Sequence, residues 1–183
     1  MKILIKADTQ PTSGMTVGEF IDQVKQIYNE YFPNSECVAD NRKVMGLEYI
    51  MIRWYISRDS SEVAHNIRAN DMLHVTFNID LEDNTESGAM YNVAIYDNNS
   101  KNSMPMPANI TLDVMDNSYF IAPEDRYMAY SRRRLPFRKT KGTPEKILAT
   151  LRKYAEKLHT MLAEDLANGA IHKEHEALLR SKL

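Results

Sequence analysis

The sequence predicts an α+β fold: an antiparallel meander of about five to seven strands, packed by an N-terminal helix and followed by a helical C-terminal third. Two amphipathic helical patterns, over residues 16–32 and 143–167, flank a region in which strand-like alternation and turn residues prevail. We expect a sheet segment over 1–130 and a basic loop with C-terminal helices over 131–183. No low-complexity linker separates the two segments, so we expect them to form one compact unit.

The first elements are a strand and a capped helix. In residues 2–6, Ile3 and Ile5 alternate with Lys2, Leu4 and Lys6, which is a plausible strand pattern. Thr16 and Glu19 have the spacing of a capping box, and Pro33 ends the pattern that follows. The apolar residues of this pattern keep helical spacing and are Val17, Phe20, Val24, Ile27 and Tyr31. We therefore expect a helix over 16–32 that covers one face of the sheet.

Four strand patterns follow. A short strand is expected over 36–40, and residues 43–57 have two partly apolar faces, as in a central strand. Residues 72–82 alternate most clearly, and residues 89–97 give a further strand. The polar residues of the 72–82 pattern are expected to face outward and are His74, Thr76, Asn78, Asp80 and Glu82.

Residues 110–122 are predicted to form a hairpin, after a loop over 98–109. A two-residue turn at Asp116 and Asn117 suits the apolar pattern on both sides of it. This register aligns two apolar pairs on one face, Val114 with Tyr119 and Leu112 with Ile121.

A second long helix is expected over 143–167. Thr143 has the side chain of an N-cap, and Pro144 suits the first helical position. The Asn-Gly pair at 168–169 is typical of a C-terminal cap. The residues beyond it, 170–183, can form a short last helix.

Composition limits the class of protein. The chain has 183 residues and is 43% hydrophobic, which is enough for a sizeable core. No apolar run approaches the length of a membrane span, so we expect no membrane partner. The single cysteine, Cys37, excludes an internal disulfide framework and favours a reducing, cytoplasmic location. The final residues, Ser-Lys-Leu, also match a peroxisomal address, which stays open as an alternative.

Charge is distributed unevenly along the chain, whose formal net charge is −2. Residues 1–130 hold 10 Lys/Arg against 19 Asp/Glu, whereas residues 131–183 hold 13 against 6. Residues 130–142, "YSRRRLPFRKTKG", contain six basic residues and no acidic one. Such asymmetry indicates either two surfaces with different partners or a basic tail that docks on the acidic body of the same chain.

The basic stretch and the helix after it form the candidate nucleic-acid-binding site. Guanidinium groups bind phosphate oxygens in a bidentate manner, and a helix N-terminus adds free N–H groups. Lysines seven and four residues apart continue the charge along one side of the helix, and Phe137 offers a ring for base stacking. The candidate residues are Arg132, Arg133, Arg134, Phe137, Arg138, Lys139, Lys141, Lys146, Lys153 and Lys157.

Other patterns that could carry chemistry are weaker. His172, His175 and Glu176 fall on one side of a helix, but their order differs from that of zinc-protease motifs, and a solvated end helix explains them. No nucleophile elbow, dinucleotide-binding motif or P-loop occurs. An enzyme would have its best site on the polar face of 74–82, a pattern that a half-solvated strand also shows. We therefore predict no catalytic residue, no metal site and no cofactor.

The sequence thus favours a non-enzymatic binding protein that contacts nucleic acid or another polyanion through residues 130–157. The fourteen asparagines and 11 methionines are typical of an AT-rich coding sequence, and we interpret the chain as a phage or mobile-element accessory protein. The alternative is a protein-interaction module: an inhibitor that binds a host protein through the acidic body, or a structural component of an assembly. DNA or RNA, the number of strands and the oligomeric state stay open.

Overall fold

The structure is a computed structural model. It describes the chain over residues 12–44, 47–56, 74–81, 102–116, 118–121, 131–134, 139–171 and 173–183. Over these residues it contains a five-stranded antiparallel sheet, two two-stranded ladders and helices on one side of the large sheet, which confirms the predicted α+β class.

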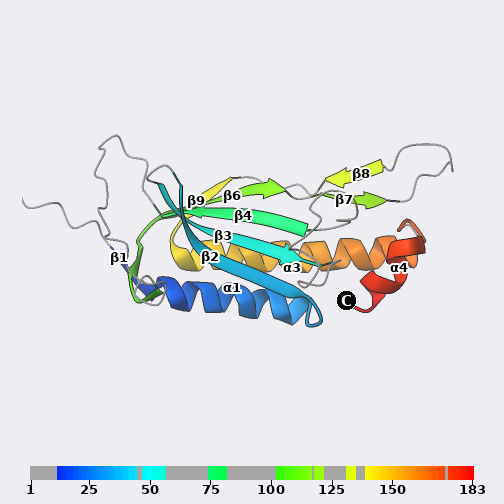
Figure 1. Ribbon diagram of the computed structural model, residues 1–183, viewed down its shortest axis with the longest axis horizontal. Helices are drawn as coiled ribbons and strands as arrows, with labels where there is room; N and C mark the ends of the chain where they lie inside the picture. Colours follow the sequence, from blue (N-terminus) through cyan, green and yellow to red (C-terminus); the bar gives the residue numbers. More distant parts are fainter. Residues whose placement is uncertain are drawn as a thin grey trace, which may run out of the picture.

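The five-stranded sheet is antiparallel throughout, and its described strands follow one another in chain order. The strands are β2 (Glu36–Val44), β3 (Leu47–Tyr55), β4 (His74–Asp80), β6 (Ile110–Asp116) and β9 (Thr140–Gly142). Within the described part of the chain, β2 and β9 are therefore the two edges of the sheet (Figure 1).

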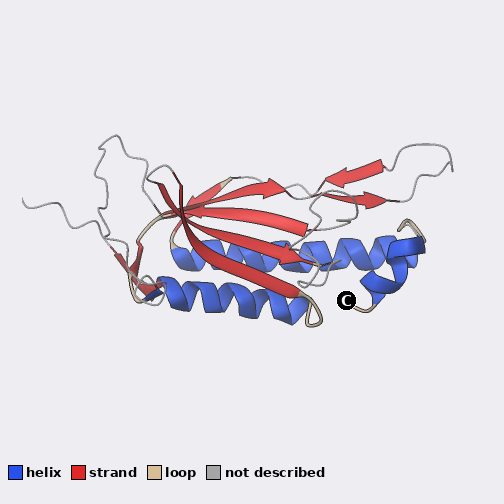
Figure 2. Cartoon of the chain, in the orientation of Figure 1, coloured by secondary structure: helices blue, strands red, loops and turns tan. Residues whose placement is uncertain are grey.

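Two long helices cover one face of this sheet (Figure 2). Helix α1 spans Val17–Tyr31 and helix α3 spans Pro144–Ala167; they pack side by side and begin at the same end of the sheet (Figure 1). The short helix α4 (Lys173–Arg180) follows α3 and buries Leu179 completely. The fold therefore has two layers, and no described helix covers the opposite face of the sheet.

Helix α1 begins where the sequence predicts it. The Glu19 N–H donates to Thr16 Oγ1 over 3.2 Å, and the Thr16 N–H donates to Glu19 Oε2 over 2.7 Å, which completes the capping box. Tyr28 is fully buried, whereas Tyr31, which the predicted apolar stripe included, is only half-buried. The Tyr28 hydroxyl donates to the Tyr55 carbonyl over 2.7 Å and so ties the helix to β3.

Helix α3 also has the predicted ends. The Lys146 N–H donates to the Thr143 hydroxyl over 3.3 Å, as expected of an N-cap. At the other end Gly169 has a φ of 68°, and the Ala170 N–H reaches back to the Asp165 carbonyl over 2.8 Å. This is the hydrogen bond of a Schellman cap, and the positive φ explains why a glycine stands there.

The core lies between the sheet and the two long helices, with Trp54 of β3 at its centre. Its indole ring lies 4.6 Å from the ring of Phe77 on β4 and 5.3 Å from that of Tyr28 on α1, measured between centroids. The ring of Tyr154 on α3 is 6.1 Å away. One side chain thus contacts the sheet and both long helices.

The predicted hairpin over 110–122 is wrong. Strand β7 (Ser118–Ile121) does not fold back on β6; it pairs with β8 (Ser131–Arg134) in a separate two-stranded ladder. The two neighbours of β6 are β4 and β9, and the register places Leu112 opposite Thr140. Because β9 occupies the edge that the hairpin would have needed, β7 has to find another partner.

A second ladder has one of its strands within residues 98–109, where the sequence predicts a loop. Strand β1 (Thr12–Thr16) pairs with β5 (Pro105–Pro107), and the Val17 N–H donates to the Met104 carbonyl over 2.8 Å. Proline has no N–H to donate, which is why the Pro-Met-Pro segment reads as a loop in the sequence. Met106 between the prolines is nevertheless fully buried, and its burial explains the close pairing.

Three further strand expectations have different outcomes. The strand over 36–40 is present but longer, because β2 continues to Val44 along the full length of β3. The strands expected over 2–6 and 89–97 lie outside the described residues.

Burial of the Cys37 thiol on β2 predicts a loss of stability in alkali. Burial raises the pKa of Cys37 from 9.0 to about 12 and outweighs the opposing effect of the nearby Lys25 ammonium. The folded protein therefore holds the thiol proton more tightly than the unfolded chain does. The contribution to stability is complete below pH 9.0 and decreases as the pH rises toward about 12.

We expect the free energy of unfolding to fall by up to about 1.4 kcal/mol per pH unit through this group. Burial also raises the pKa of Tyr28, which adds a fall of the same sign. Urea unfolding of wild type and Cys37→Ala between pH 8 and pH 11 gives the pH dependence of the free energy of unfolding for each protein. Because both proteins keep Tyr28, the difference between the two slopes is the contribution of Cys37. Equal slopes for the two proteins would contradict the prediction.

Candidate polyanion-binding surface

Five of the predicted site residues lie on β9, directly before it, or on the N-terminal part of α3. Lys139 and Lys141 lie just before and within β9, and Lys146, Lys153 and Lys157 lie on α3. All five side chains are exposed. We call these five residues the lysine row.

The spacing on α3 places its three lysines on one flank. A helix turns once in 3.6 residues, so Lys146, Lys153 and Lys157 point within about 40° of one another. The opposite flank of α3 packs on α1: Arg152 forms a bidentate ion pair with Glu30, one of whose hydrogen bonds is 3.2 Å long. The hydrogen bond from Arg152 also lowers the pKa of Glu30. The lysines therefore lie on the flank that is turned away from α1.

The turn between β9 and α3 brings the two halves of the row together. The Lys146 ammonium donates to the Lys141 carbonyl over 3.2 Å. A Cβ at Gly142 would lie only 2.5 Å from Lys146 Cδ, so the glycine leaves room for that side chain to lie back over the strand. The Lys146 ammonium therefore lies next to β9, the strand that contains Lys141.

Two carboxylates mark one end of the lysine row, on the outer face of the sheet. Lys139 Nζ lies 3.8 Å from Asp113 Oδ2 on β6, and both side chains are well exposed, at 61% and 42%. Asp80 on β4 lies near the same pair. Burial raises the pKa of Asp80, with a smaller contribution from Asp113, against the lowering effect of Lys139. Asp113 has no signal in the sequence, because only the pairing of β4, β6 and β9 brings it close to Asp80 and Lys139.

The prediction of a basic loop over residues 130–142 is wrong in part, because this stretch contains two strands, β8 and β9. In β8 the register places Arg133 opposite Tyr119 and Arg134 opposite Ser118 of β7. The pairing of β8 with β7 and of β9 with β6 explains why residues 131–134 and 140–142 are extended. Phe137 and Arg138, and the side chains of Arg132, Arg133 and Arg134, lie outside the described part of the structure.

Docking of the basic tail on the acidic body explains only some of its charges. Arg152 pairs with Glu30, and Lys139 lies close to Asp113, so two cations of the C-terminal segment do contact carboxylates of residues 1–130. Lys153 and Lys157, by contrast, form no ion pair with any residue that the structure describes. Docking on the described carboxylates therefore does not account for these two charges.

The other candidate sites receive less support. The side chains of His172 and His175 lie outside the described residues, and elsewhere in the described ranges no three His, Cys, Asp or Glu residues converge as metal ligands. Thr76, Asn78 and Asp80 form a half-buried polar face on β4, as expected of an outward-facing strand. None of the described helices is long and apolar enough to cross a membrane.

Comparison with known proteins adds no assignment. No protein-family model matches the chain, and no curated protein or solved structure is significantly similar to it. Its function therefore has to be argued from its own residues.

Proposed function

We propose that the chain is a non-enzymatic binding protein that contacts nucleic acid, or another polyanion, through the lysine row. The observation that carries the proposal is the exposure of five lysines on β9, directly before it and along one flank of α3, two of which have no carboxylate partner among the described residues. The arginines of β8, with Phe137 and Arg138, belong to the proposed surface on the grounds of sequence alone.

The dimensions of the lysine row suit a phosphate backbone. Lys146 and Lys157 are separated by about 16 Å along the axis of α3, because each helical residue adds about 1.5 Å. A row of this length meets several successive phosphates of one strand. Lysine binds phosphate as a point charge, so the surface supplies affinity and little sequence preference.

Binding of labelled single-stranded and duplex oligonucleotides between about 50 and 200 mM salt tests the proposal. If each of the five lysines neutralises one phosphate, the logarithm of the association constant falls with the logarithm of salt at a slope of about −3.5 for single strands and about −4.5 for duplexes. A wild-type protein that binds neither polymer at the lower salt concentration overturns the proposal.

Asp113 is expected to weaken the proposed interaction. Its carboxylate lies near Lys139 and competes with a phosphate for that ammonium. Since exposed ion pairs contribute about 0–1 kcal/mol, Asp113→Asn should raise the affinity for oligonucleotides by up to about fivefold. Anisotropy titrations of the variant and wild type at the same salt concentration measure this change.

Asp22→Asn is the matched control, because it also replaces an aspartate with asparagine, but at an exposed position on α1. It changes the net charge by the same amount away from the lysine row and should leave affinity unchanged. An equal gain from both variants would show that net charge alone, and not the position of Asp113, governs binding.

A further inference from the structure

The two edge strands of the described sheet differ in length. Strand β9 has three residues, whereas β2 has nine and pairs with β3 at every position from Glu36 to Val44 without a bulge. No proline interrupts β2, and no described strand pairs with its other side. Such an edge carries a row of main-chain N–H and C=O groups that can pair with a further strand. Proteins usually shorten, bulge or cover these edges, so this long and regular one needs an explanation.

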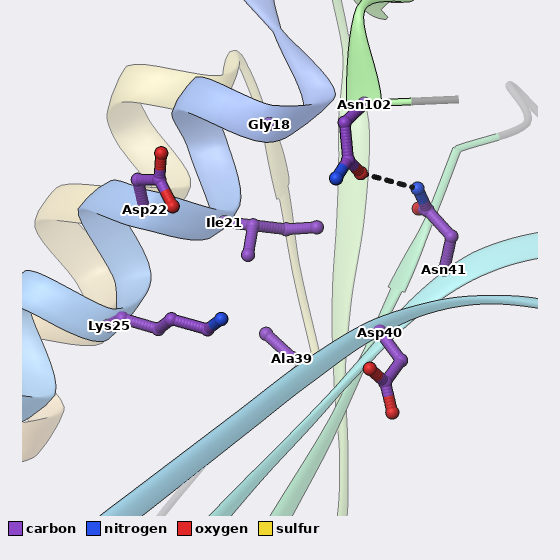
Figure 3. A pocket seen from close by; sticks show the side chains of 8 residues that line it. All are labelled: Gly18, Ile21, Asp22, Lys25, Ala39, Asp40, Asn41 and Asn102. Atoms are coloured by element: carbon purple, nitrogen blue, oxygen red, sulfur yellow. Dashed lines mark hydrogen bonds between the residues drawn. The ribbon is translucent and has the colours of Figure 1, made fainter. Parts of the chain in front are cut away.

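A groove of about 640 Å³ lies between this edge strand and α1 (Figure 3). On β2 it is lined by three successive residues, Ala39, Asp40 and Asn41. Successive side chains of a strand point to opposite faces, so a space that touches all three residues also reaches the main chain at the edge of the strand. The groove is therefore accessible to a chain that pairs with β2.

The opposite wall of the groove is one flank of α1. The residues that line it are three and four positions apart and so share one side of the helix: Gly18, Ile21, Asp22 and Lys25. Seven helical residues rise by about 10.5 Å, which is the length of about three residues of an extended chain. Asn102 also lines the groove and accepts a hydrogen bond of 3.3 Å from the Asn41 amide. The groove thus has the length of a short strand beside residues 39–41.

The two faces of β2 offer different chemistry to a neighbouring strand. On the face toward α1, Ile21 and Ala39 are buried and apolar, and Figure 3 shows the Lys25 side chain reaching from α1 toward β2. The formal charges of Asp22 and Lys25 cancel on this side. Asp40 is exposed and, by strand alternation, lies on the opposite face from Ala39. Aliphatic side chains therefore suit the face toward α1, and a basic side chain suits the outer face, across from Asp40.

We propose that β2 binds an extended segment of another protein, which adds to the edge of the sheet and places alternate side chains in the groove. In this mode of recognition the main-chain hydrogen bonds supply affinity and the contacts of alternate side chains supply specificity. The segment alternates aliphatic residues, which lie on Ile21 and Ala39, with lysine or arginine, which lie across from Asp40. The interface is at the opposite edge of the described sheet from the lysine row and is separate from it.

NMR titration of the isotope-labelled protein with a capped seven-residue peptide, in which lysine and valine alternate, tests the proposal. We expect saturable shifts of the main-chain amides of Ala39, Asp40 and Asn41. We also expect slower hydrogen exchange of the alternate β2 amides that point away from β3. The exchange rates separate strand addition from charge attraction, because only hydrogen bonding or burial protects a main-chain amide.

Three comparison peptides each remove one component of the interaction. N-methylation of two adjacent residues blocks both edges of the peptide, since successive amides point to opposite sides, and should weaken binding at least tenfold. Serine in place of valine removes the aliphatic groups from the groove. Glutamate in place of lysine puts a like charge across from Asp40. Both of these peptides should bind more weakly than the lysine–valine peptide.

Variants of the protein test the position of the basic side chain. Asp40→Asn should weaken binding of the lysine–valine peptide by up to about fivefold, the range of a cross-strand charge pair. Asp113→Asn makes the same change on β6 and should leave binding unchanged. An equal loss from both variants would contradict the placement across from Asp40.

The proposal is overturned if the peptide does not protect the β2 amides, or if the N-methylated peptide binds as tightly as the parent. It is also overturned if those amides are already protected in the free protein, because a second copy or another part of the chain then occupies the edge. None of these results depends on whether the lysine row binds nucleic acid.

Discussion

Replacing Trp54 with alanine is expected to lower the free energy of unfolding by about 3–5 kcal/mol, the usual cost of truncating a buried aromatic side chain. Trp54 is fully buried and contacts the rings of Phe77, Tyr28 and Tyr154. The cavity left by the indole would lie between the sheet and both long helices, so no single element can move to fill it. Domains of ordinary stability have only about 5–15 kcal/mol to lose.

Denaturant unfolding followed by circular dichroism measures this loss, because the variant has no tryptophan left for fluorescence. Met115→Ala is the control. Met115 is 64% exposed on β6, so its truncation should change the free energy of unfolding by no more than about 0.5 kcal/mol. A loss below about 1 kcal/mol for Trp54→Ala would show that the rings around it repack, contrary to the central position described above.

Local signals in the sequence were sufficient to predict the helices. Thr16 with Glu19, and Thr143 with Pro144, mark helix starts through contacts within one turn, and the structure shows both. The alternation around Trp54 and Phe77 likewise predicts buried faces, because the side-chain period of a strand is local. These features depend on residues that are near one another in the chain.

Strand pairing could not be predicted in the same way. The turn at Asp116 suited the apolar pattern, yet that pattern does not say whether Leu112 pairs with Ile121 or, as observed, with Thr140. The pairing of β1 with β5 similarly depends on burial of Met106 between two prolines, which no local rule anticipates. Register between distant segments is decided by the whole core.

The same distinction between local signals and contacts of distant segments applies to the residues of the candidate sites. The three lysines of α3 were predictable because helical spacing alone places them on one flank. The position of Asp113 beside Lys139 follows from the pairing of β6 with β9, and the position of Lys25 opposite Asn41 follows from how α1 packs on β2. The groups that modify or extend the proposed function are thus those that only the structure brings together.

The double substitution of Lys153 and Lys157 by glutamine is expected to weaken polyanion binding more than any other substitution predicted for the lysine row. Both ammonium groups are exposed on one flank of α3 and have no ion-pair partner among the described residues. If each contacts one phosphate, the salt slope decreases in magnitude by about 1.4 for single strands and about 1.8 for duplexes. At about 0.1 M salt these values correspond to roughly 25-fold and 60-fold weaker binding.

The matched control removes the same two charges elsewhere, through Lys25→Gln and Lys182→Gln. Lys25 lies on α1 and faces β2, the edge strand opposite β9. The Lys182 ammonium donates to the Asn34 carbonyl over 2.6 Å, beyond the end of α1. Lys146 is left in place because its ammonium also contacts the Lys141 carbonyl. Anisotropy titrations at several salt concentrations should show the full slope for the control and the reduced slope for the Lys153 and Lys157 variant. Equal losses in both proteins would mean that net charge, not the lysine row, attracts the polyanion, and an unchanged slope in both would locate binding elsewhere on the chain.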